Sequence, residues 1–221
     1  MKVGTDGVLL GCLVEAGKSK RILDIGTGTG LLALMMAQQS EAIIDAIEID
    51  EIAYEEAKQN FATSKWSERL NAYNCSFKDF LTRTGYDLII SNPPFFNHGK
   101  QYSISDEQRS LARHDKELPF EILIDNAIKI LTDDGKFWLI LPKNEALDFT
   151  KIATEKRLYL QKEILIKPKP SRQYNRVVMC FGKQEMKSVQ QTIVIYRENS
   201  ETTEQYYELT KDFLLWNKIH N

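Results

Sequence analysis

The sequence predicts an α/β fold, in which a mostly parallel seven-stranded sheet carries helices on both faces and ends in a C-terminal antiparallel hairpin. Up to about residue 145, short apolar runs alternate with helix-like segments, which is the pattern of a parallel sheet covered by helices. Glycines over residues 26–30 mark the turn from one apolar run into the helix that follows it. Farther along, two runs rich in β-branched and aromatic residues flank a turn that contains two prolines, which predicts the hairpin.

The same local signals place each element along the chain. Strands are predicted over residues 21–25, 43–49, 71–75, 87–91 and 136–141, the hairpin over residues 158–166 and 177–181, and one more strand over residues 191–196. Helices are predicted over residues 8–16, 31–39, 51–63 and 120–131, once more after Pro142, and over residues 203–216. The first helix follows the cap signal Thr5-Asp6, and residues 133–135 predict a turn. The polar connection over residues 97–119 is too long for a simple turn, and such connections are often functional.

Length and composition favour a single domain over residues 1–221, with a catalytic core over 1–145 and a sheet-closing region over 146–221. The 3 cysteines are far apart and include no Cys-x-x-Cys pair, so neither a disulfide framework nor a metal site is indicated. No apolar run reaches the roughly 20 residues that span a bilayer. We therefore expect a soluble, cytoplasmic protein, with a monomer as the default state.

The charge is unevenly distributed along the chain. The formal net charge is −2, yet residues 151–187 carry ten basic and three acidic residues. A basic region of this kind can bind nucleic-acid phosphates, although a solvated surface is an equally simple explanation. The residues predicted to contact phosphates are Lys167, Lys169, Arg172 and Arg176 around the hairpin turn, and Arg109, Arg113 and His114 in the long connection.

The glycine loop predicts a site for an adenosine nucleoside. Gly26, Gly28 and Gly30, with Thr27 among them, allow the backbone to turn sharply and to approach a ligand closely. Asp24 lies at the end of the preceding strand, where its carboxylate can organise the loop and accept from a ligand ammonium. The next strand ends at Glu48, about 20 residues farther on, a spacing that suits a carboxylate accepting from two ribose hydroxyls.

The segment Asn92-Pro93-Pro94-Phe95 follows the fourth predicted strand and is the most informative motif for the reaction. Two successive prolines end the strand and fix an extended backbone at the carboxyl edge of the sheet, where open α/β proteins bind ligands. The Asn92 amide oxygen and a backbone carbonyl oxygen of Asn92 or Pro93 can accept the two hydrogens of an NH₂ group. Phe95 can stack on a planar base or amide.

This pair of acceptors suits transfer of a methyl group to a planar nitrogen. The lone pair of an amine attached to an aromatic ring is delocalised into the ring, and two acceptors that hold the hydrogens out of plane would localise it. The proton can leave after the new bond has formed, so no strong base is needed. Catalysis would then depend on positioning and fixed dipoles.

The two motifs at this spacing resemble the class I, Rossmann-like, S-adenosylmethionine-dependent amino-methyltransferases. Together with residues 1–10, which include Lys-Val-Gly-Thr-Asp-Gly, and the C-terminal strands, they look like the bacterial valine-tRNA adenine N6-methyltransferases. Those enzymes modify the adenine immediately 3′ of the anticodon, so the resemblance implies S-adenosyl-L-methionine as cofactor and tRNA as substrate. Family members usually carry a short segment before this motif, so we expect that the chain starts late or is truncated at Met1.

The resemblance also implies roles for individual residues. Residues 26–30 would hold the methionine part of the cofactor, Glu48 would bind its ribose, Ile49 would also contact the cofactor, and Thr5 would help to close the site. An acidic residue that contacts the cofactor's adenine in related enzymes is replaced here by Ser76. Phe77 could stack on the adenine, and Asp79 could take the place of the missing acid.

Other functions are compatible with parts of this pattern. Methylation of a glutamine amide in release factors uses the same acceptors, but those proteins carry an additional helical domain for which we expect no room here. Methylation of guanine N2 in ribosomal RNA is typical of Asn-Pro-Pro-Phe-His, whereas Phe96 and Asn97 separate Phe95 from His98. A catalytically silent module that binds cofactor or RNA would have no use for the paired acceptors, and a nicotinamide oxidoreductase fits poorly with Asp24.

Overall fold

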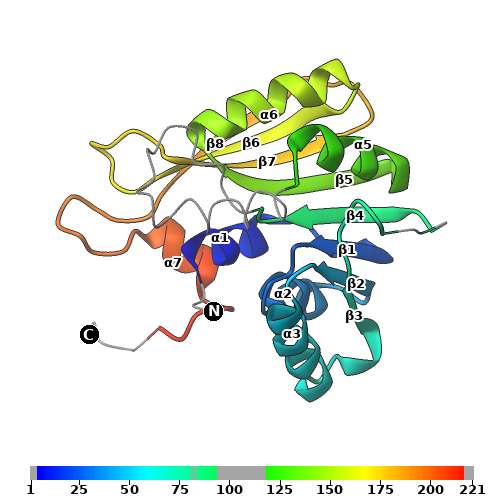
Figure 1. Ribbon diagram of the computed structural model, residues 1–221. Helices are drawn as coiled ribbons and strands as arrows, with labels where there is room; N and C mark the ends of the chain where they lie inside the picture. Colours follow the sequence, from blue (N-terminus) through cyan, green and yellow to red (C-terminus); the bar gives the residue numbers. More distant parts are fainter. Residues whose placement is uncertain (1–3, 81, 83, 94–117, 217–221) are drawn as a thin grey trace, which may run out of the picture.

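The computed structural model describes residues 4–80, 82, 84–93 and 118–216, and the account below concerns these residues. Within them, a single sheet of eight strands carries helices on both faces (Figure 1). The strands are β1 (Arg21–Ile25), β2 (Ile43–Glu48), β3 (Leu70–Asn74), β4 (Tyr86–Ser91), β5 (Leu131–Pro142), β6 (Tyr159–Lys167), β7 (Arg176–Gly182) and β8 (Val189–Val194). The helices are α1 (Thr5–Leu13), α2 (Leu31–Gln39), α3 (Glu51–Thr63), η1 (Ser67–Arg69), α5 (Phe120–Ile130), α6 (Lys143–Glu155) and α7 (Glu204–Thr210).

The strand order is β3-β2-β1-β4-β5-β7-β6-β8. Strands β1 to β5 are parallel, β7 is antiparallel to both β5 and β6, and β8 pairs in parallel with β6. The predicted α/β class, the parallel core and the hairpin are therefore confirmed. The sheet has eight strands and not the predicted seven, because the additional predicted strand joins it at the edge beside β6. The order reverses between β1 and β4, which is where ligands bind in open α/β sheets.

Each face of the sheet is covered by its own apolar layer. Helices α1, α2, α3 and α7 pack on one face, against alternate strand residues such as Ile22 and Ile90. Helices α5 and α6 pack on the other, against residues such as Leu23 and Ile89 (Figure 1). Adjacent residues of the inner strands thus point into different layers, which explains why these strands are apolar throughout.

Two predicted helices have different bounds in the structure. Helix α1 begins at Thr5, and its N-cap is Gly4, which offers no side-chain cap. Asp6, half of the predicted cap signal, pairs with Arg176 instead. Helix α7 begins within one residue of its predicted start, after the Thr203 cap, but ends at Thr210, because the chain folds back to place the Trp216 ring 5.5 Å from that of Tyr207. A straight helix, which rises about 1.5 Å per residue, would separate these rings too far.

The turn predicted over residues 133–135 is also wrong, because these residues lie within β5 as an irregularity. Tyr86 pairs with Leu131 and Leu88 pairs with Lys136, so Asp87 alone lies opposite the extra length of residues 132–135. The glycine and polar residues that favour a turn are accommodated as a bulge because the sheet continues on both sides.

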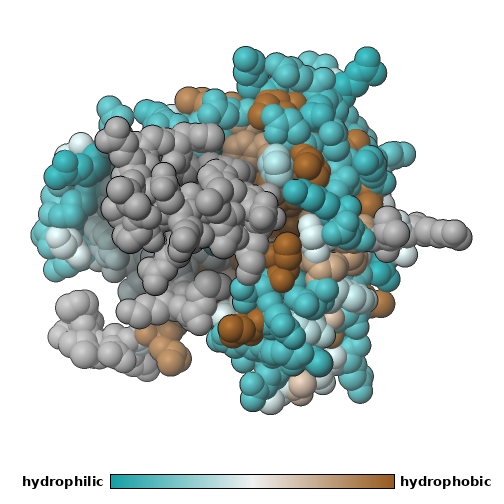
Figure 2. Space-filling model, viewed as in Figure 1, coloured by the Kyte–Doolittle hydropathy of each residue, from teal (hydrophilic) through white to brown (hydrophobic). Residues whose placement is uncertain are grey.

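The surface seen in Figure 2 is mostly hydrophilic, with apolar side chains in small groups. None of the helices in the described ranges is long and apolar enough to cross a membrane.

Candidate active site

The loop after β1 is shaped by glycines in the left-handed region. Gly26, Gly28 and Gly30 have φ values of 70°, 59° and 86°. The amides of Gly26 and Thr27 both donate to the Ile47 carbonyl, at 2.9 and 3.0 Å, so the loop is anchored to the neighbouring strand β2. At Gly30 a side chain is also excluded sterically, because a Cβ atom would lie 2.5 Å from a ring carbon of Phe61.

Asp24 supports this loop from inside the protein. It is fully buried, and its Oδ2 accepts from the Thr27 hydroxyl at 2.6 Å and from the Ala33 amide at 3.1 Å. Burial, and to a smaller extent the nearby charge of Glu48, raises the pKa of Asp24 to about 7, although its two hydrogen bonds oppose the shift. Oδ1 is buried and has no hydrogen-bond partner among the described residues. The carboxylate therefore organises the loop, and it does not lie on the cavity wall described next.

A cavity of about 950 Å³ opens at the carboxyl ends of β1, β2 and β4. Most of the residues predicted to bind a cofactor line it. These are Thr5, Gly26, Thr27, Gly28, Glu48, Ile49, Ser76, Phe77 and Asn92. Asp24 and Gly30 are the two that do not, because the first lies beneath the loop and the second packs against α3.

Glu48 joins the loop to the second strand at the cavity wall. Its Oε2 accepts from the Gly28 amide and its Oε1 from the Asp50 amide, each at 2.9 Å. A carboxylate has about four acceptor positions, so both oxygens keep capacity for a ligand hydroxyl. Asp50 caps α3 by accepting from the amides of Ile52 and Ala53.

The rim of the cavity is partly apolar, and it includes one residue, Ile52, that was not predicted from the sequence. Ile49 and Ile52 line the cavity although their exposed fractions are 42% and 82%. Ile49 lies just before the Asp50 cap and Ile52 lies in the first turn of α3, and together they offer an apolar surface for a planar ring.

Ser76 and Asp79 are the two residues considered at the position of the acidic contact with the cofactor's adenine, and they lie differently relative to the cavity. Ser76 lines the cavity, and its hydroxyl accepts from the Lys78 amide at 3.2 Å, whereas Asp79 does not line it. Phe77 is 5% exposed and belongs to the core beneath α5, so most of its ring is used in packing.

Asn92 lies opposite the loop, directly beyond β4. The Ser91 hydroxyl donates to the Ile25 carbonyl at 2.9 Å and so fixes the end of β4 to the end of β1. Asn92 and Pro93 line the cavity, and no hydrogen bond within the described residues occupies the Asn92 side chain. Pro94 and Phe95 lie outside the described residues.

The predicted phosphate contacts around the hairpin turn lie away from the cavity wall. Lys167 donates to the Pro170 carbonyl at 2.7 Å. Lys169 donates to the Glu198 carbonyl at 3.1 Å and to the Ser200 hydroxyl at 2.8 Å. The hairpin turn is thus tied to the connection between β8 and α7. Because β6 and β8 run parallel to the core strands, both segments lie at the same edge of the sheet as the cavity (Figure 1).

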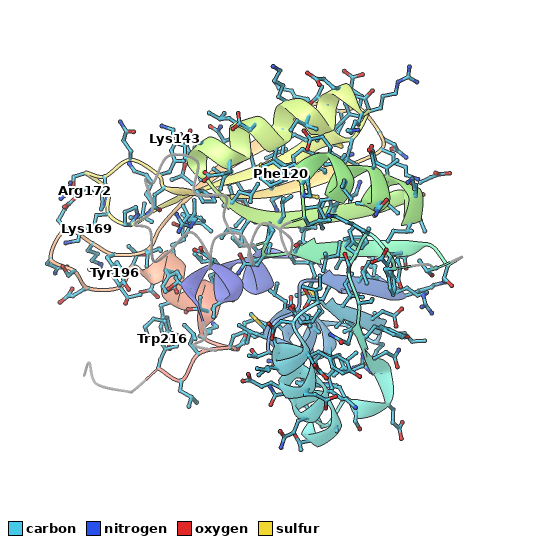
Figure 3. The ribbon with its side chains drawn as sticks, viewed as in Figure 1. Phe120, Lys143, Lys169, Arg172, Tyr196 and Trp216 are labelled. Atoms are coloured by element: carbon cyan, nitrogen blue, oxygen red, sulfur yellow. The ribbon has the colours of Figure 1, made fainter. Side chains whose placement is uncertain are left out.

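The other two predicted phosphate contacts of the hairpin region, Arg172 and Arg176, differ in their contacts with the rest of the protein. Arg172 is exposed near Lys169 (Figure 3), whereas Arg176 donates from Nε to Asp6 at 2.8 Å. Lys143, which was not predicted, directly follows β5 and lies with its Nζ 4.7 Å from the centre of the Tyr174 ring. The sequence feature that could have pointed to Lys143 is a basic residue directly after a strand, at the carboxyl edge of the sheet. Arg109, Arg113 and His114 lie outside the described residues.

Comparison with known proteins identifies the class. The family model described as the methyltransferase small domain matches residues 3–156. A predicted O-methyltransferase from Agrobacterium tumefaciens has the same fold, with a TM-score of 0.71 at 18% identity over 94% of this chain and 96% of that one. A putative RNA methyltransferase from Pyrococcus horikoshii gives a TM-score of 0.56 at 19% identity, over 80% and 82% of the two chains. The chain is a methyltransferase of the small-domain family, with a class I Rossmann-like fold.

More similar relatives define the family within this class. A protein from Flavobacterium psychrophilum named tRNA1(Val) (adenine(37)-N6)-methyltransferase is 42% identical, over 97% of this chain and 93% of its own length. A protein of the same name from Flavobacterium johnsoniae is 40% identical over the same shares of the two chains. The chain belongs to this tRNA1(Val) (adenine(37)-N6)-methyltransferase family, and the resemblance seen in the sequence motifs is confirmed.

Proposed function

We propose that this protein transfers a methyl group from S-adenosylmethionine to the exocyclic N6 of the adenine immediately 3′ of the anticodon in valine tRNA. The single observation that supports the proposal best is that Asn92 and the glycine loop line one cavity, together with Glu48. The names of relatives about 40% identical over nearly the whole chain supply the acceptor and its position.

The residues present fit this cofactor. A cavity of about 950 Å³ can hold a nucleoside with its amino-acid tail. The loop over residues 26–28 would hold the methionine part, and Glu48 would accept from the ribose hydroxyls. Ile49, Ser76 and Phe77 would surround the adenine, and Thr5 would close the site. When bound, the cofactor supplies an electrophilic methyl group on a positively charged sulfur.

Asn92 would orient the amine that receives the methyl group. Its amide oxygen and a backbone carbonyl of residues 92–93 accept the two N6 hydrogens, which directs the nitrogen lone pair toward the methyl carbon. Transfer of the methyl group to this nitrogen would leave S-adenosylhomocysteine as the second product, and one N6 proton would pass to solvent. Phe95 would stack on the adenine, and Pro93 and Pro94 would hold the segment extended.

The tRNA would approach along the carboxyl edge of the sheet. Lys167, Lys169 and Arg172 lie at that edge within the basic region, and residues 109, 113 and 114 belong to the connection that follows Asn92 in sequence. The protein would be a monomer with one domain over residues 1–221, and its region 146–221 would supply the RNA contacts of the hairpin turn. A tRNA substrate implies a cytoplasmic enzyme.

The test is methyl transfer in vitro to total tRNA from a strain that lacks this protein, followed by nucleoside analysis. The expected product is N6-methyladenosine in valine tRNA with the parent protein, and none with Asn92→Ala. N2-methylguanosine would overturn the base assignment. Labelling of protein but not of RNA would establish the glutamine-amide alternative, and cofactor binding without transfer to either would indicate a silent module.

A further inference from the structure

Asp6 and Arg176 form an ion pair that joins the start of the chain to the C-terminal half of the sheet. Arg176 Nε donates to Asp6 Oδ2 at 2.8 Å. The Asp6 side chain is 21% exposed and that of Arg176 is 28% exposed, so the pair is partly removed from water. Arg176 is the first residue of β7 and pairs with Pro142 of β5, which makes it a fixed point on the sheet.

The first turn of α1, which contains Asp6, forms part of the cavity. Thr5, Asp6 and Gly7 all line it. A Cβ atom built on Gly7 would lie 3.3 Å from a methyl carbon of Leu31 and 3.9 Å from Nδ2 of Asn92. This turn therefore lies directly against the helix that follows the glycine loop and against the proposed acceptor residue. A small displacement of the turn would alter both halves of the site.

The helix provides little to hold its own first turn. Its N-cap, Gly4, has no side chain, and the Val8 amide donates to the Gly4 carbonyl at 3.3 Å. Uncapped first turns fray, since their amides lack internal partners. Besides the buried apolar side chains farther along the helix, the Asp6 carboxylate attaches this turn to the sheet through its ion pair with Arg176.

We propose that Arg176 is a positioning residue, which acts through Asp6 to hold the first turn of α1 as the wall between the cofactor and Asn92. This inference rests on the proposed function for what the cavity binds. It assigns Arg176 a role inside the fold, in place of the phosphate contact that its sequence position predicted. Arg176 itself does not line the cavity, so its effect on cofactor binding must pass through the helix.

The chain contains a matched control for this ion pair. Glu15, just beyond the other end of α1, pairs with Lys162 of β6 at 2.7 Å. This pair also connects the α1 region to the sheet, but Glu15 is 74% exposed and does not line the cavity. Replacing Glu15 removes a carboxylate of the same kind from the same region without touching the first turn.

The test compares Arg176→Gln, Asp6→Ala and their double variant with Glu15→Ala. Arg176→Gln should weaken binding of S-adenosylhomocysteine, measured by calorimetry, by about tenfold, since the pair is intermediate between exposed and buried. The Val8 amide should exchange with solvent faster in Arg176→Gln, as followed by NMR of the ligand-free protein. The double variant should bind no more weakly than Asp6→Ala alone. Glu15→Ala should match the parent in both measurements.

Two results would overturn the proposal. The first is Arg176→Gln with parent values for both Val8 exchange and S-adenosylhomocysteine affinity. The second is a smaller salt dependence of tRNA binding in Arg176→Gln with unchanged Val8 exchange, which would make Arg176 a phosphate contact. Failure of the proposed function looks different, because the parent would then methylate no RNA while the exchange of Val8 still responded to Arg176→Gln.

Discussion

The Gly28 amide donates to the Glu48 carboxylate at 2.9 Å, so one hydrogen bond joins the loop after β1 to the end of β2 at the wall of the cavity. The two residues are separated by 20 positions in sequence; Gly28 lies in the loop that follows β1, and Glu48 ends the adjacent parallel strand β2. The same carboxylate is thus placed to hold the loop and to accept from a ligand.

Replacing Glu48 should therefore weaken cofactor binding. We expect Glu48→Ala to reduce the affinity for S-adenosylhomocysteine by about 1–3 kcal/mol, because hydrogen bonds to a charged acceptor are lost and the Gly28 amide loses its partner. Calorimetry measures the affinity, and thermal unfolding checks that the variant is folded. An unchanged affinity in a folded variant would remove Glu48 from the ribose site.

Replacing Asn92 should affect turnover more than binding. Asn92→Ala should keep the affinity for S-adenosylhomocysteine within a few-fold of the parent but reduce single-turnover methylation by about 10² or more, the scale for loss of an oriented polar group. Survival of turnover in this variant would show that the Asn92 amide is not an acceptor for the reacting amine.

Gly30 should be required for stability and not for contact with a ligand. Gly30→Ala would place a side chain at a positive φ and a Cβ atom 2.5 Å from a ring carbon of Phe61. Together these effects should destabilise the protein by about 2–4 kcal/mol, which urea unfolding measures. Gly17→Ala is the control, because the nearest atom to its added Cβ would be 3.9 Å away, and it should change stability by less than about 0.5 kcal/mol. Equal stabilities of the two variants would contradict the strain argument.

Asp24 should make stability depend on pH between its unfolded and folded pKa values. Burial raises the pKa of Asp24 from 3.8 to about 7, so between these values the folded protein holds a proton that the unfolded chain has lost. The free energy of unfolding of the parent should then fall, relative to that of Asp24→Asn, as the pH rises from about 4 to about 7. Urea unfolding at several pH values measures the difference. A difference that is constant across this range would mean that Asp24 titrates normally.

Arg172 should contribute to tRNA affinity through charge alone. Removal of one phosphate contact in Arg172→Ala should weaken binding and reduce the slope of log affinity against log salt by somewhat less than one unit. Phe95→Ala should instead reduce methylation without altering this slope, because stacking releases no counterions. If Arg172→Ala keeps the parent slope, the hairpin turn does not meet the RNA.

The sequence by itself determined the elements whose signals are local. Strand β1 and helices α2 and α3 have the predicted bounds, because a short apolar strand, a glycine loop and the cap at Asp50 each mark their own ends. The spacing from the loop to Glu48 and then to Asn92 also placed the cavity, since the carboxyl ends of parallel strands meet at one edge.

The tertiary structure decided what depends on partners distant in sequence. From its sequence position Asp6 is predicted to cap a helix, but in the fold β7 brings Arg176, 170 residues away, beside it. Likewise, Arg176 is predicted from its sequence position to contact phosphate, but in the fold its Nε donates to that carboxylate. Residues 133–135 are predicted to form a turn, but in the fold β5 pairs with β4 on both sides of them. In each case a contact formed only by folding outweighed a local preference, because local preferences amount to about 1 kcal/mol and a partly buried ion pair or a continuous strand ladder can exceed that.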